Sequence, residues 1–275
     1  MDAADRTPPA PSNPPGHPVT ARAQFSVSWD GNGSAGAEVI RSYASAMKII
    51  EPLVRPGSDS EPCVSIEPSV LYFGTPVVLL TTENPDTSVN VAPISSAWAL
   101  GKVVVLGLGP DGQTAHNLAT RPELVINLAA PGQWQAVERL APLTGRHPVP
   151  PTKHDGCRFE KDKFGAAGLS SRPSHTVRPP RVDGCPLQLE ARAERLRPDA
   201  SGEFLIVEAH VLKVHADPRI VVPGTDHIDP ATWSPLIYNF RHYFGLGPEL
   251  GHSYRSTTPR GPMPQPSGTE GGGHA

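Results

Sequence analysis

The segment Ser88–Gly109, SVNVAPISSAWALGKVVVLGLG, decides the fold, because two apolar runs in it flank the short polar segment Pro93–Ser96. Strand-forming residues in Ser88–Val91, Ala97–Leu100 and Val103–Leu108 predict three β-strands. The connections between them are short, so we expect an antiparallel meander. Proline and two hydroxyl side chains do not suit the interior of a sheet, and Pro93–Ser96 is therefore expected to be a loop with a function of its own.

The rest of the central chain also contains more strands than helices. Further strands are predicted at Ser69–Phe73, Pro76–Thr82, Glu123–Leu128, Pro186–Leu196 and Phe204–His215. Short helices are predicted at Gln113–Ala119, Gln133–Leu143 and Glu160–Leu169. The strand Phe204–His215 is apolar on both faces and should be central in its sheet. This pattern favours a mainly β protein, a small barrel with a few peripheral helices.

The composition of the chain changes towards both ends. The first and last segments are rich in proline and glycine and poor in core-forming residues, so we expect them to be disordered tails. Apolar residues at helical spacing in Ala37–Val54 predict an amphipathic helix. The expected organisation is a tail at 1–35, an N-terminal helix and linker at 36–60, a barrel domain at 61–225, a C-terminal helical segment packed on the barrel at 226–255, and a tail at 256–275.

Charge and composition exclude several classes of partner. The formal net charge of the 275 residues is -3, so no general attraction to nucleic acid or to anionic lipid is expected. No apolar run approaches the roughly 18 residues of a membrane span, and the N-terminal segment lacks the apolar core of a signal peptide. We therefore expect a cytoplasmic protein with neither a membrane nor a nucleic-acid partner.

The three cysteines, Cys63, Cys157 and Cys185, form no CxxC pair. An odd count without a secretion signal indicates reduced thiols. A metal site could combine Cys157 with His154, but the spacing matches no zinc pattern. We expect buried structural cysteines and no metal site.

The segment Gly107–Gly112, GLGPDG, fits the G-x-G-x-x-G pattern of a dinucleotide-binding turn. The following strand region, ELVINLAAPG, ends without the acidic residue that would contact a ribose, and hairpins rather than a βαβ unit precede the motif. We therefore reject a Rossmann fold. A glycine-rich turn that leads into a helix can still approach a phosphate group.

Several blocks in order resemble the flavin reductase-like family, whose fold is an FMN-binding split barrel. They are VLYFGTPVVLLTTENPDTSVNVAPISSAWAL, VVVLGLG with GQTAHNLATRPELVINL, and DKFGAAGLSSRPSHTVRPPRVDGCPLQLEA. The resemblance runs from about Ser69 to Asp217 and continues more weakly in HIDPATWSPLIYNFRHYFGLG. It implies a homodimer with one FMN per subunit near the interface, and reduction of the flavin by NADH or NADPH.

The resemblance also implies a set of site residues. Those expected at the flavin ring are Asn90, Ala92, Pro93, Ile94, Ser95 and Ser96; those expected at the phosphate are Gln113, Thr114 and Asn117, with Lys163 as a flavin or nucleotide contact. Many relatives carry Lys-Asp before the threonine, whereas Gly112 and Gln113 stand here, so Lys163 or an arginine must supply the positive charge. The structural alternatives are a strand end for the two serines, a polar helix face for Asn117 and a solvated pair for Lys163.

The expected chemistry is hydride transfer from a nicotinamide to N5 of the flavin. The cofactors perform this reaction, so no catalytic side chain is assigned. His116, His215 and His242 are expected to be structural or surface residues, Phe164 to be core, and Trp98 to pack against the barrel. Three functions stay open: a flavin reductase that can supply a partner monooxygenase, an FMN-dependent oxidoreductase acting directly on a small organic substrate, and a non-catalytic flavin carrier.

Overall fold

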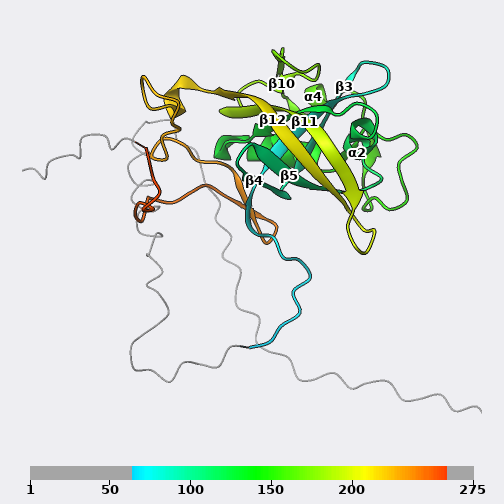
Figure 1. Cartoon of the computed structure of the whole chain (residues 1–275). Coiled ribbons are helices and arrows are strands. Elements are labelled where there is room, and N and C mark those ends of the chain that lie inside the picture. Colours follow the sequence, from blue (N-terminus) through cyan, green and yellow to red (C-terminus); the bar gives the residue numbers. More distant parts are fainter. Residues whose placement is uncertain (1–63, 259–275) are drawn as a thin grey trace, which may run out of the picture. The chain divides into compact units, whose positions relative to one another are not determined.

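A seven-stranded antiparallel sheet organises the computed structural model, which describes residues 64–258 (Figure 1). The strand order is β3-β2-β6-β11-β12-β5-β4. The strands are β2 (Val78–Glu83), β3 (Val89–Ile94), β4 (Ala97–Leu100), β5 (Val103–Leu108), β6 (Glu123–Leu128), β11 (Leu187–Pro198) and β12 (Leu205–Ala216). The sheet curls into a split barrel, as the sequence predicts, and β12 is central between β11 and β5.

The predicted meander is wrong. β3 and β4 are consecutive in the chain but lie at opposite edges of the sheet, β3 paired with β2 and β4 paired with β5. Pro93 and Ile94 belong to β3 and not to the predicted loop, so only Ser95 and Ser96 join these two edges. The backbone N–H of Gly107 donates to the Ser96 carbonyl at 2.8 Å. In a curled sheet the two edges approach each other. A short connection in the sequence therefore cannot distinguish a hairpin from the closure of a barrel.

Two hydrophobic clusters lie on the two faces of the sheet. Side chains of a strand alternate between faces, and β2 with the residue before it supplies both clusters. Val78 and Leu80 pack inside the barrel with Leu106, Leu124, Ile126 and Val207. Val77 and Leu79 pack on the other face with Val137, Leu140, Ala167 and Leu236. This double burial explains why the run VVLL is apolar at every position.

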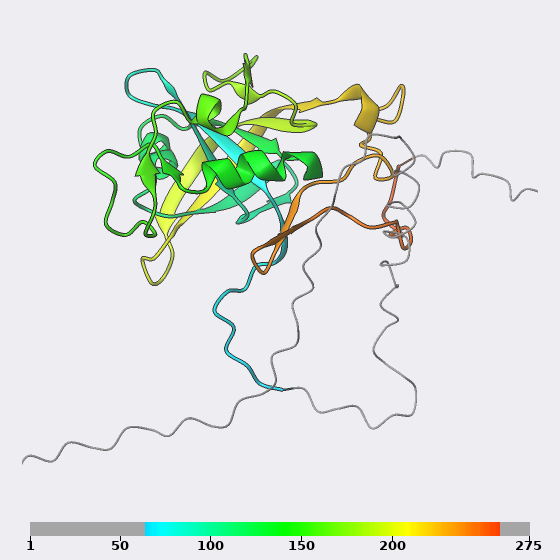
Figure 2. The same ribbon diagram turned by 180° about the vertical axis from the view of Figure 1, so that it is seen from behind.

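Three short helices and several short strands cover the barrel. The elements are α2 (Gln113–Leu118), α3 (Trp134–Leu140), α4 (Lys163–Ala167), the 3₁₀ turns η1 (Pro131–Gln133) and η2 (Pro218–Ile220), and the strand pairs β7 (Leu143–Thr144) with β8 (Arg158–Phe159) and β9 (Ser171–Arg172) with β10 (Arg181–Val182). Figure 2, the view from behind, shows α3 lying across the barrel. All three predicted helices of this region are present, each shorter than expected.

The C-terminal segment 226–255 is not helical, contrary to the prediction. It contains the hairpin β13 (Ile237–Asn239) and β14 (His242–Phe244), and β13 pairs with β1 (Phe73–Pro76). The two residues of the turn, Phe240 and Arg241, have φ angles of 44° and 66°. Such a turn is usually marked by glycine or asparagine at these positions, and neither residue occurs there. The sequence thus carries no hairpin signal at this place.

Some predictions fall outside the described residues, namely the helix Ala37–Val54, the segments 1–35 and 36–60, Cys63, and the end of the chain after residue 258. Of the other cysteines, Cys185 is buried and Cys157 is half-buried. Trp98 does not pack into the barrel: its side chain is 60% exposed. Within 64–258, the helices are too short or too polar to cross a bilayer.

Candidate functional site

Three adjoining pockets lie on one side of the barrel. The first, here the aromatic pocket, has a volume of about 410 Å³. It is lined by Tyr72, Val77, Ala92, Pro93, Ile94, Ser95, Ser96, Gly107, Gly109, Val137, Ala141, Leu143, Lys153, Tyr238 and Tyr243. One wall is thus the end of β3 with the following link, and the opposite wall brings in the C-terminal hairpin. A planar ring fits such a space between a backbone edge and aromatic side chains.

The position of β3 in the sheet makes its backbone available to a ligand. β3 is an edge strand that pairs only with β2, so one row of its N–H and C=O groups has no strand partner. Pro93 lies opposite Leu79 and, as proline lacks an N–H group, suits an edge strand. Ala92, Pro93 and Ile94 can therefore present backbone groups to the polar edge of a bound ring.

The two serines of the β3–β4 link have different surroundings. The Ser96 hydroxyl donates to the Gly107 carbonyl at 2.6 Å and so fastens the link to β5. Gly107 is tight here, since an added Cβ atom would lie 3.1 Å from the Ser96 Cβ. Ser95 is half-buried and lines the aromatic pocket. The Ser96 hydroxyl thus has a structural hydrogen bond, and of the two pocket-lining serines Ser95 is the better candidate for a ligand contact.

The second pocket, here the lysine pocket, is small, about 110 Å³. Its polar lining comes from Asn90, Gln113, Thr114, Thr144, Lys153 and Lys163. The Lys163 ammonium group is 3.2 Å from the Asn90 amide oxygen, and the residue is only 3% exposed. Burial, together with the nearby charge of Lys153, lowers the pKa of Lys163 to about 8.

No carboxylate forms an ion pair with Lys163 among residues 64–258. A buried cation without a negative partner is costly, and a bound anion would offset that cost. The second cation, Lys153, lines the same small space. The lysine pocket is therefore suited to an anion such as a phosphate group.

Hydrogen bonds between buried side chains hold the floor of the lysine pocket. The Asn90 amide donates to the hydroxyls of Thr114 at 3.0 Å and Thr82 at 3.3 Å. Because the Thr114 oxygen accepts in its bond, its own hydroxyl proton can be donated to a ligand. Asn90 thus connects Lys163 to Thr114 and orients both.

Asn117 lies behind the pocket and lines none of the three. Its amide donates to Thr82 at 3.0 Å and to Asn84 at 2.8 Å, while Gln113 donates to its oxygen at 2.7 Å. Asn117 therefore positions Gln113 from behind the pocket lining. The other nine predicted site residues, Asn90, Ala92, Pro93, Ile94, Ser95, Ser96, Gln113, Thr114 and Lys163, line at least one pocket.

Lys153 is a site residue that the sequence reading missed. It belongs to the proline-rich segment between β7 and β8, which the hydrogen bond from Thr152 to Asp111 (2.7 Å) holds against the residues before α2. Its ammonium nitrogen is 4.0 Å from where a Cβ of Gly112 would be. Lys153 thus brings a positive charge from a distant loop close to Gly112. The sequence showed that a lysine is absent before Thr114, but it did not show which residue brings a positive charge to this place.

The tyrosines of the aromatic pocket were also missed. Ring centroids of Tyr72 and Tyr238 are 5.4 Å apart, and those of Tyr238 and Tyr243 are 5.2 Å apart. The Tyr243 hydroxyl donates to Glu138 of α3 at 2.7 Å, and burial and this carboxylate raise the pKa of Tyr243. The hairpin β13–β14 is thereby fastened beside the pocket. The family resemblance of the segment IYNFRHYFGLG indicated that this part of the chain belongs to the domain, but not that its tyrosines line a pocket.

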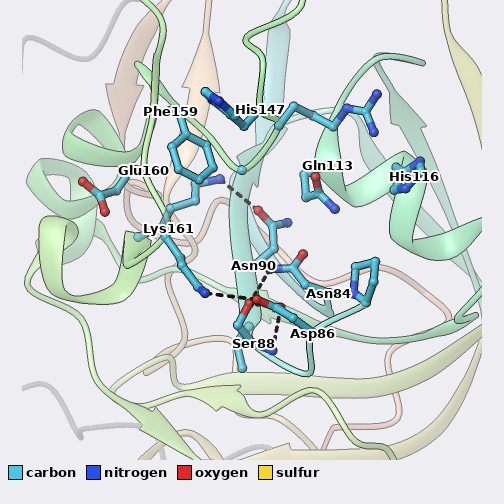
Figure 3. A pocket seen from close by; sticks show the side chains of 15 residues that line it. Asn84, Asp86, Ser88, Asn90, Gln113, His116, His147, Phe159, Glu160 and Lys161 are labelled. Carbon is cyan, nitrogen blue, oxygen red and sulfur yellow. Dashed lines mark hydrogen bonds and ion pairs between the residues drawn. The ribbon is translucent and has the colours of Figure 1, made fainter.

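The third pocket, here the outer pocket, has a volume of about 350 Å³ and is drawn in Figure 3. It is lined by Asn84, Pro85, Asp86, Ser88, Val89, Asn90, Gln113, His116, Gly145, Arg146, His147, Phe159, Glu160, Lys161 and Lys163. Lys161 forms an ion pair with Asp86 at 3.1 Å. The Phe159 and His147 rings lie next to each other, with centroids 5.1 Å apart.

His215 and His242 line none of the three pockets, whereas His116 lines the outer pocket. His215 contacts the buried carboxylate of Glu190 at 2.6 Å. Burial alone would raise the pKa of Glu190, but donors from Thr176, His175 and His215 lower it to about 2. This polar cluster is satisfied within the protein, and no group of three or more His, Cys, Asp or Glu side chains in 64–258 is arranged to hold a metal ion.

The chain belongs to the flavin reductase-like family, since its residues 70–247 match the family model described as a flavin reductase like domain. A Bacillus subtilis (strain 168) protein described as uncharacterized protein YdfE is 46% identical over 195 residues, which cover 70% of this chain and 94% of that protein. An uncharacterized protein of Methanothermobacter thermautotrophicus is 24% identical over 59% of this chain and 73% of its own length.

Solved structures share the fold at low sequence identity. Flavoredoxin of Desulfovibrio vulgaris (Miyazaki F) has a TM-score of 0.57 at 16% identity and covers 71% of this chain and 99% of its own. Nitrilotriacetate monooxygenase component B from Bacillus cereus also has a TM-score of 0.57, at 17% identity, covering 70% and 100%. The Pseudomonas fluorescens 2-nitrobenzoate 2-nitroreductase NbaA has 0.56 at 17% identity, covering 70% and 89%.

Proposed function

We propose that this protein is an NAD(P)H-dependent flavin reductase that binds the riboflavin phosphate unit, as in FMN, across the aromatic and lysine pockets. One observation carries the proposal: the ammonium group of Lys163 is buried without a carboxylate partner among the described residues, and Lys153 lines the same pocket. The adjoining aromatic pocket is wide enough for a ring. Lys153 lines both pockets, so an anion and a ring of one ligand can bind together.

The residues present fit this ligand. Lys153, Lys163 and the hydroxyl of Thr114 would hold the phosphate through charge-assisted hydrogen bonds. The free backbone edge at Ala92, Pro93 and Ile94 would face the polar edge of the isoalloxazine ring, with Ser95 as a further donor. Donors that are already in position stabilise negative charge without rearrangement, which favours the reduced ring.

A bound flavin would supply the redox chemistry, accepting a hydride at N5 from the nicotinamide. The protein's part is to place the two reactants at roughly 3–3.5 Å and to exclude water. Tyr72, Tyr238 and Tyr243 form the apolar wall that does this in the aromatic pocket. No side chain needs to act as a base, in keeping with the lack of an assigned catalytic residue.

A second copy of the chain would complete the assembly. One apolar face of the barrel exposes four large side chains, those of Phe73, Trp98, Leu100 and Phe204. Thr75 lines the same face, and its hydroxyl is buried without a hydrogen-bond partner among the described residues. Exposed apolar faces of this kind typically mark protein interfaces. Ser96 and Gly107 line both this face and the aromatic pocket, so a homodimer formed here would lie next to the flavin.

Two other functions compete. The flavin could pass electrons directly to a small organic substrate, which the three-tyrosine wall of the aromatic pocket favours; NbaA, a 2-nitrobenzoate 2-nitroreductase, has this fold. A flavin carrier without turnover is the second alternative. In the leading proposal, by contrast, the protein acts as a flavin reductase and would supply reduced flavin to a partner monooxygenase. The Bacillus cereus protein of this fold is named as component B of such an enzyme.

Anaerobic titration of the flavin-loaded protein tests the proposal. We expect NADH or NADPH alone to bleach the flavin absorbance near 450 nm, the preferred nucleotide being the one that bleaches faster. Bleaching that needs an added organic substrate would favour the direct oxidoreductase, and bleaching by dithionite alone would favour the carrier. A protein that takes up no flavin in a calorimeter would contradict all three.

A further inference from the structure

We propose that two neighbouring residues of α3, Glu138 and Arg139, are positioning residues for the two halves of the flavin site. Glu138 holds the tyrosine wall of the aromatic pocket, and Arg139 holds Lys163 in the lysine pocket. The inference rests on the proposed function, because it requires a flavin bound across these two pockets. Glu138 and Arg139 line none of the three pockets, so they act through the residues that they contact.

α3 lies between the two elements that these residues fasten. Its buried side chains pack in one apolar cluster with Ala167 of α4, and Tyr238 and Tyr243 of the β13–β14 hairpin pack against the same cluster. Consecutive residues of an α-helix point about 100° apart. The exposed side chains of Glu138 and Arg139 can therefore reach two different neighbours from one turn of α3.

Arg139 fastens the C-terminal end of α4. Its Nε and one of its Nη nitrogens donate to the Ala167 carbonyl at 2.9 and 2.7 Å. Ala167 is buried, and the next two backbone N–H groups, those of Gly168 and Leu169, donate to carbonyls further back in the helix. Arg139 therefore supplies the donors that the last carbonyl of α4 needs.

The position of Lys163 depends on α4, whose first residue it is. α4 has only five residues, and so short a helix is not stable by itself in water. Its N-terminal end is capped by Asp162, which accepts from the Gly165 N–H at 2.9 Å. Because Arg139 fixes the other end, the two contacts together hold Lys163 in the lysine pocket. The burial that lowers the pKa of Lys163 to about 8 depends on this packing.

Glu138 fastens the hairpin beside the aromatic pocket. Its carboxylate accepts a hydrogen bond from the Tyr243 hydroxyl at 2.7 Å. The Tyr243 ring also lies next to Trp134 at the start of α3, with ring centroids 6.3 Å apart. Tyr243 and Val137 both line the aromatic pocket. The hydrogen bond to Glu138 therefore sets the distance between two parts of the pocket wall.

Calorimetric titration of the full chain with FMN and riboflavin tests the role of Arg139. Arg139→Met keeps the apolar stem but removes the donors, and it should weaken FMN binding about tenfold while riboflavin binding stays within about twofold. The pH above which FMN affinity falls, about 8 in the unaltered protein, should rise by about one pH unit, because a loosened α4 admits water to Lys163. Arg139→Lys can still donate to the carbonyl and should largely restore both properties.

Tyr243→Phe and Glu138→Ala test the other half of the inference. Each variant removes one partner of the same hydrogen bond, and the phenylalanine keeps the ring. Both should weaken FMN and riboflavin binding equally, by about three- to tenfold, and leave the pH dependence of FMN affinity in place. Since the two variants lose one shared bond, the double variant should bind no more weakly than the weaker single variant.

Gln135→Met is the matched control, because Gln135 is an exposed polar residue of α3 that lines none of the three pockets. It should change none of these measurements. If Arg139→Met weakened FMN and riboflavin alike with an unchanged pH dependence, or if Glu138→Ala weakened FMN alone, the inference would be overturned and the proposed function would stand. If the unaltered protein bound neither flavin, the proposed function itself would be contradicted, and this inference with it.

Discussion

The barrel interior and the lysine pocket are both buried, but their side chains are opposite in kind. Leu80, Leu106 and Leu124 have no exposed surface and pack in the apolar cluster inside the barrel. Asn90 and Lys163 are almost as buried, yet they carry an amide and a charge. Burial of hydrocarbon stabilises the fold, whereas burial of an unpaired charge opposes it. The comparison shows that the apolar barrel supports a pocket whose buried charge opposes folding, and a bound anion would offset that cost.

The free-energy cost of burying an unpaired charge can be judged from the pKa of Lys163. Its pKa falls from 10.5 to about 8, which corresponds to a destabilisation on the order of 3 kcal/mol when the lysine is charged. That cost is comparable to one truncated leucine in a core. The predictions below separate the two regions, beginning with the largest expected effect.

Leu80→Ala should lower the free energy of unfolding by about 2–5 kcal/mol, because it leaves a cavity in the barrel. Chemical denaturation measures the loss. Flavin affinity, measured where the variant is still folded, should change less than threefold. A loss of affinity as large as that caused by Lys163→Met would show that the two regions are not independent.

Lys163→Met should reduce flavin phosphate affinity about 10- to 100-fold, the equivalent of a lost charge-assisted bond at roughly 1.5–3 kcal/mol. The ligand-free variant should be more stable than the unaltered protein at neutral pH, because the buried charge is gone. Calorimetry gives the affinity and thermal unfolding the stability. Riboflavin, which lacks the phosphate, is the control ligand and should bind both proteins alike.

The pH dependence should run in opposite directions for affinity and stability. In the ligand-free protein the pKa of Lys163 is lowered, so the unfolded chain binds more protons between about pH 8 and 10.5. Its contribution to stability therefore rises with pH in that range. FMN affinity should fall above about pH 8, as the lysine loses its charge. Both trends should disappear in Lys163→Met; if they persist, another group is responsible.

The smallest effect expected is that of the two serines of the β3–β4 link. Ser96→Ala removes the hydrogen bond to Gly107 and should cost about 1 kcal/mol of stability with little change in flavin affinity. Ser95→Ala should do the reverse, weakening flavin binding several-fold at unchanged stability. Equal effects of the two variants on both measurements would contradict the division of roles.

Much of this molecule was predictable where the signal is local. Strands β4, β5 and β6 begin and end where the sequence places them, because alternation and β-branched residues act over a few residues. The hairpin β13–β14 was not predictable, since its turn at Phe240 and Arg241 is held by pairing with β1 instead of by turn-forming residues. The prediction of a meander was wrong for a related reason: the two-residue link between β3 and β4 joins the two edges of the curled sheet and does not form a hairpin.

The sequence by itself determined the mainly β class, the places of the central strands, the family and nine pocket-lining residues, because these depend on neighbouring residues or on ordered motifs. Only the tertiary structure decided that Asn117 supports the site from behind, that Lys153 enters it from a loop, and that tyrosines of the C-terminal hairpin form its wall. The physical reason is that charge and burial depend on distances in space, and residues far apart in the chain leave no periodic pattern that reveals those distances.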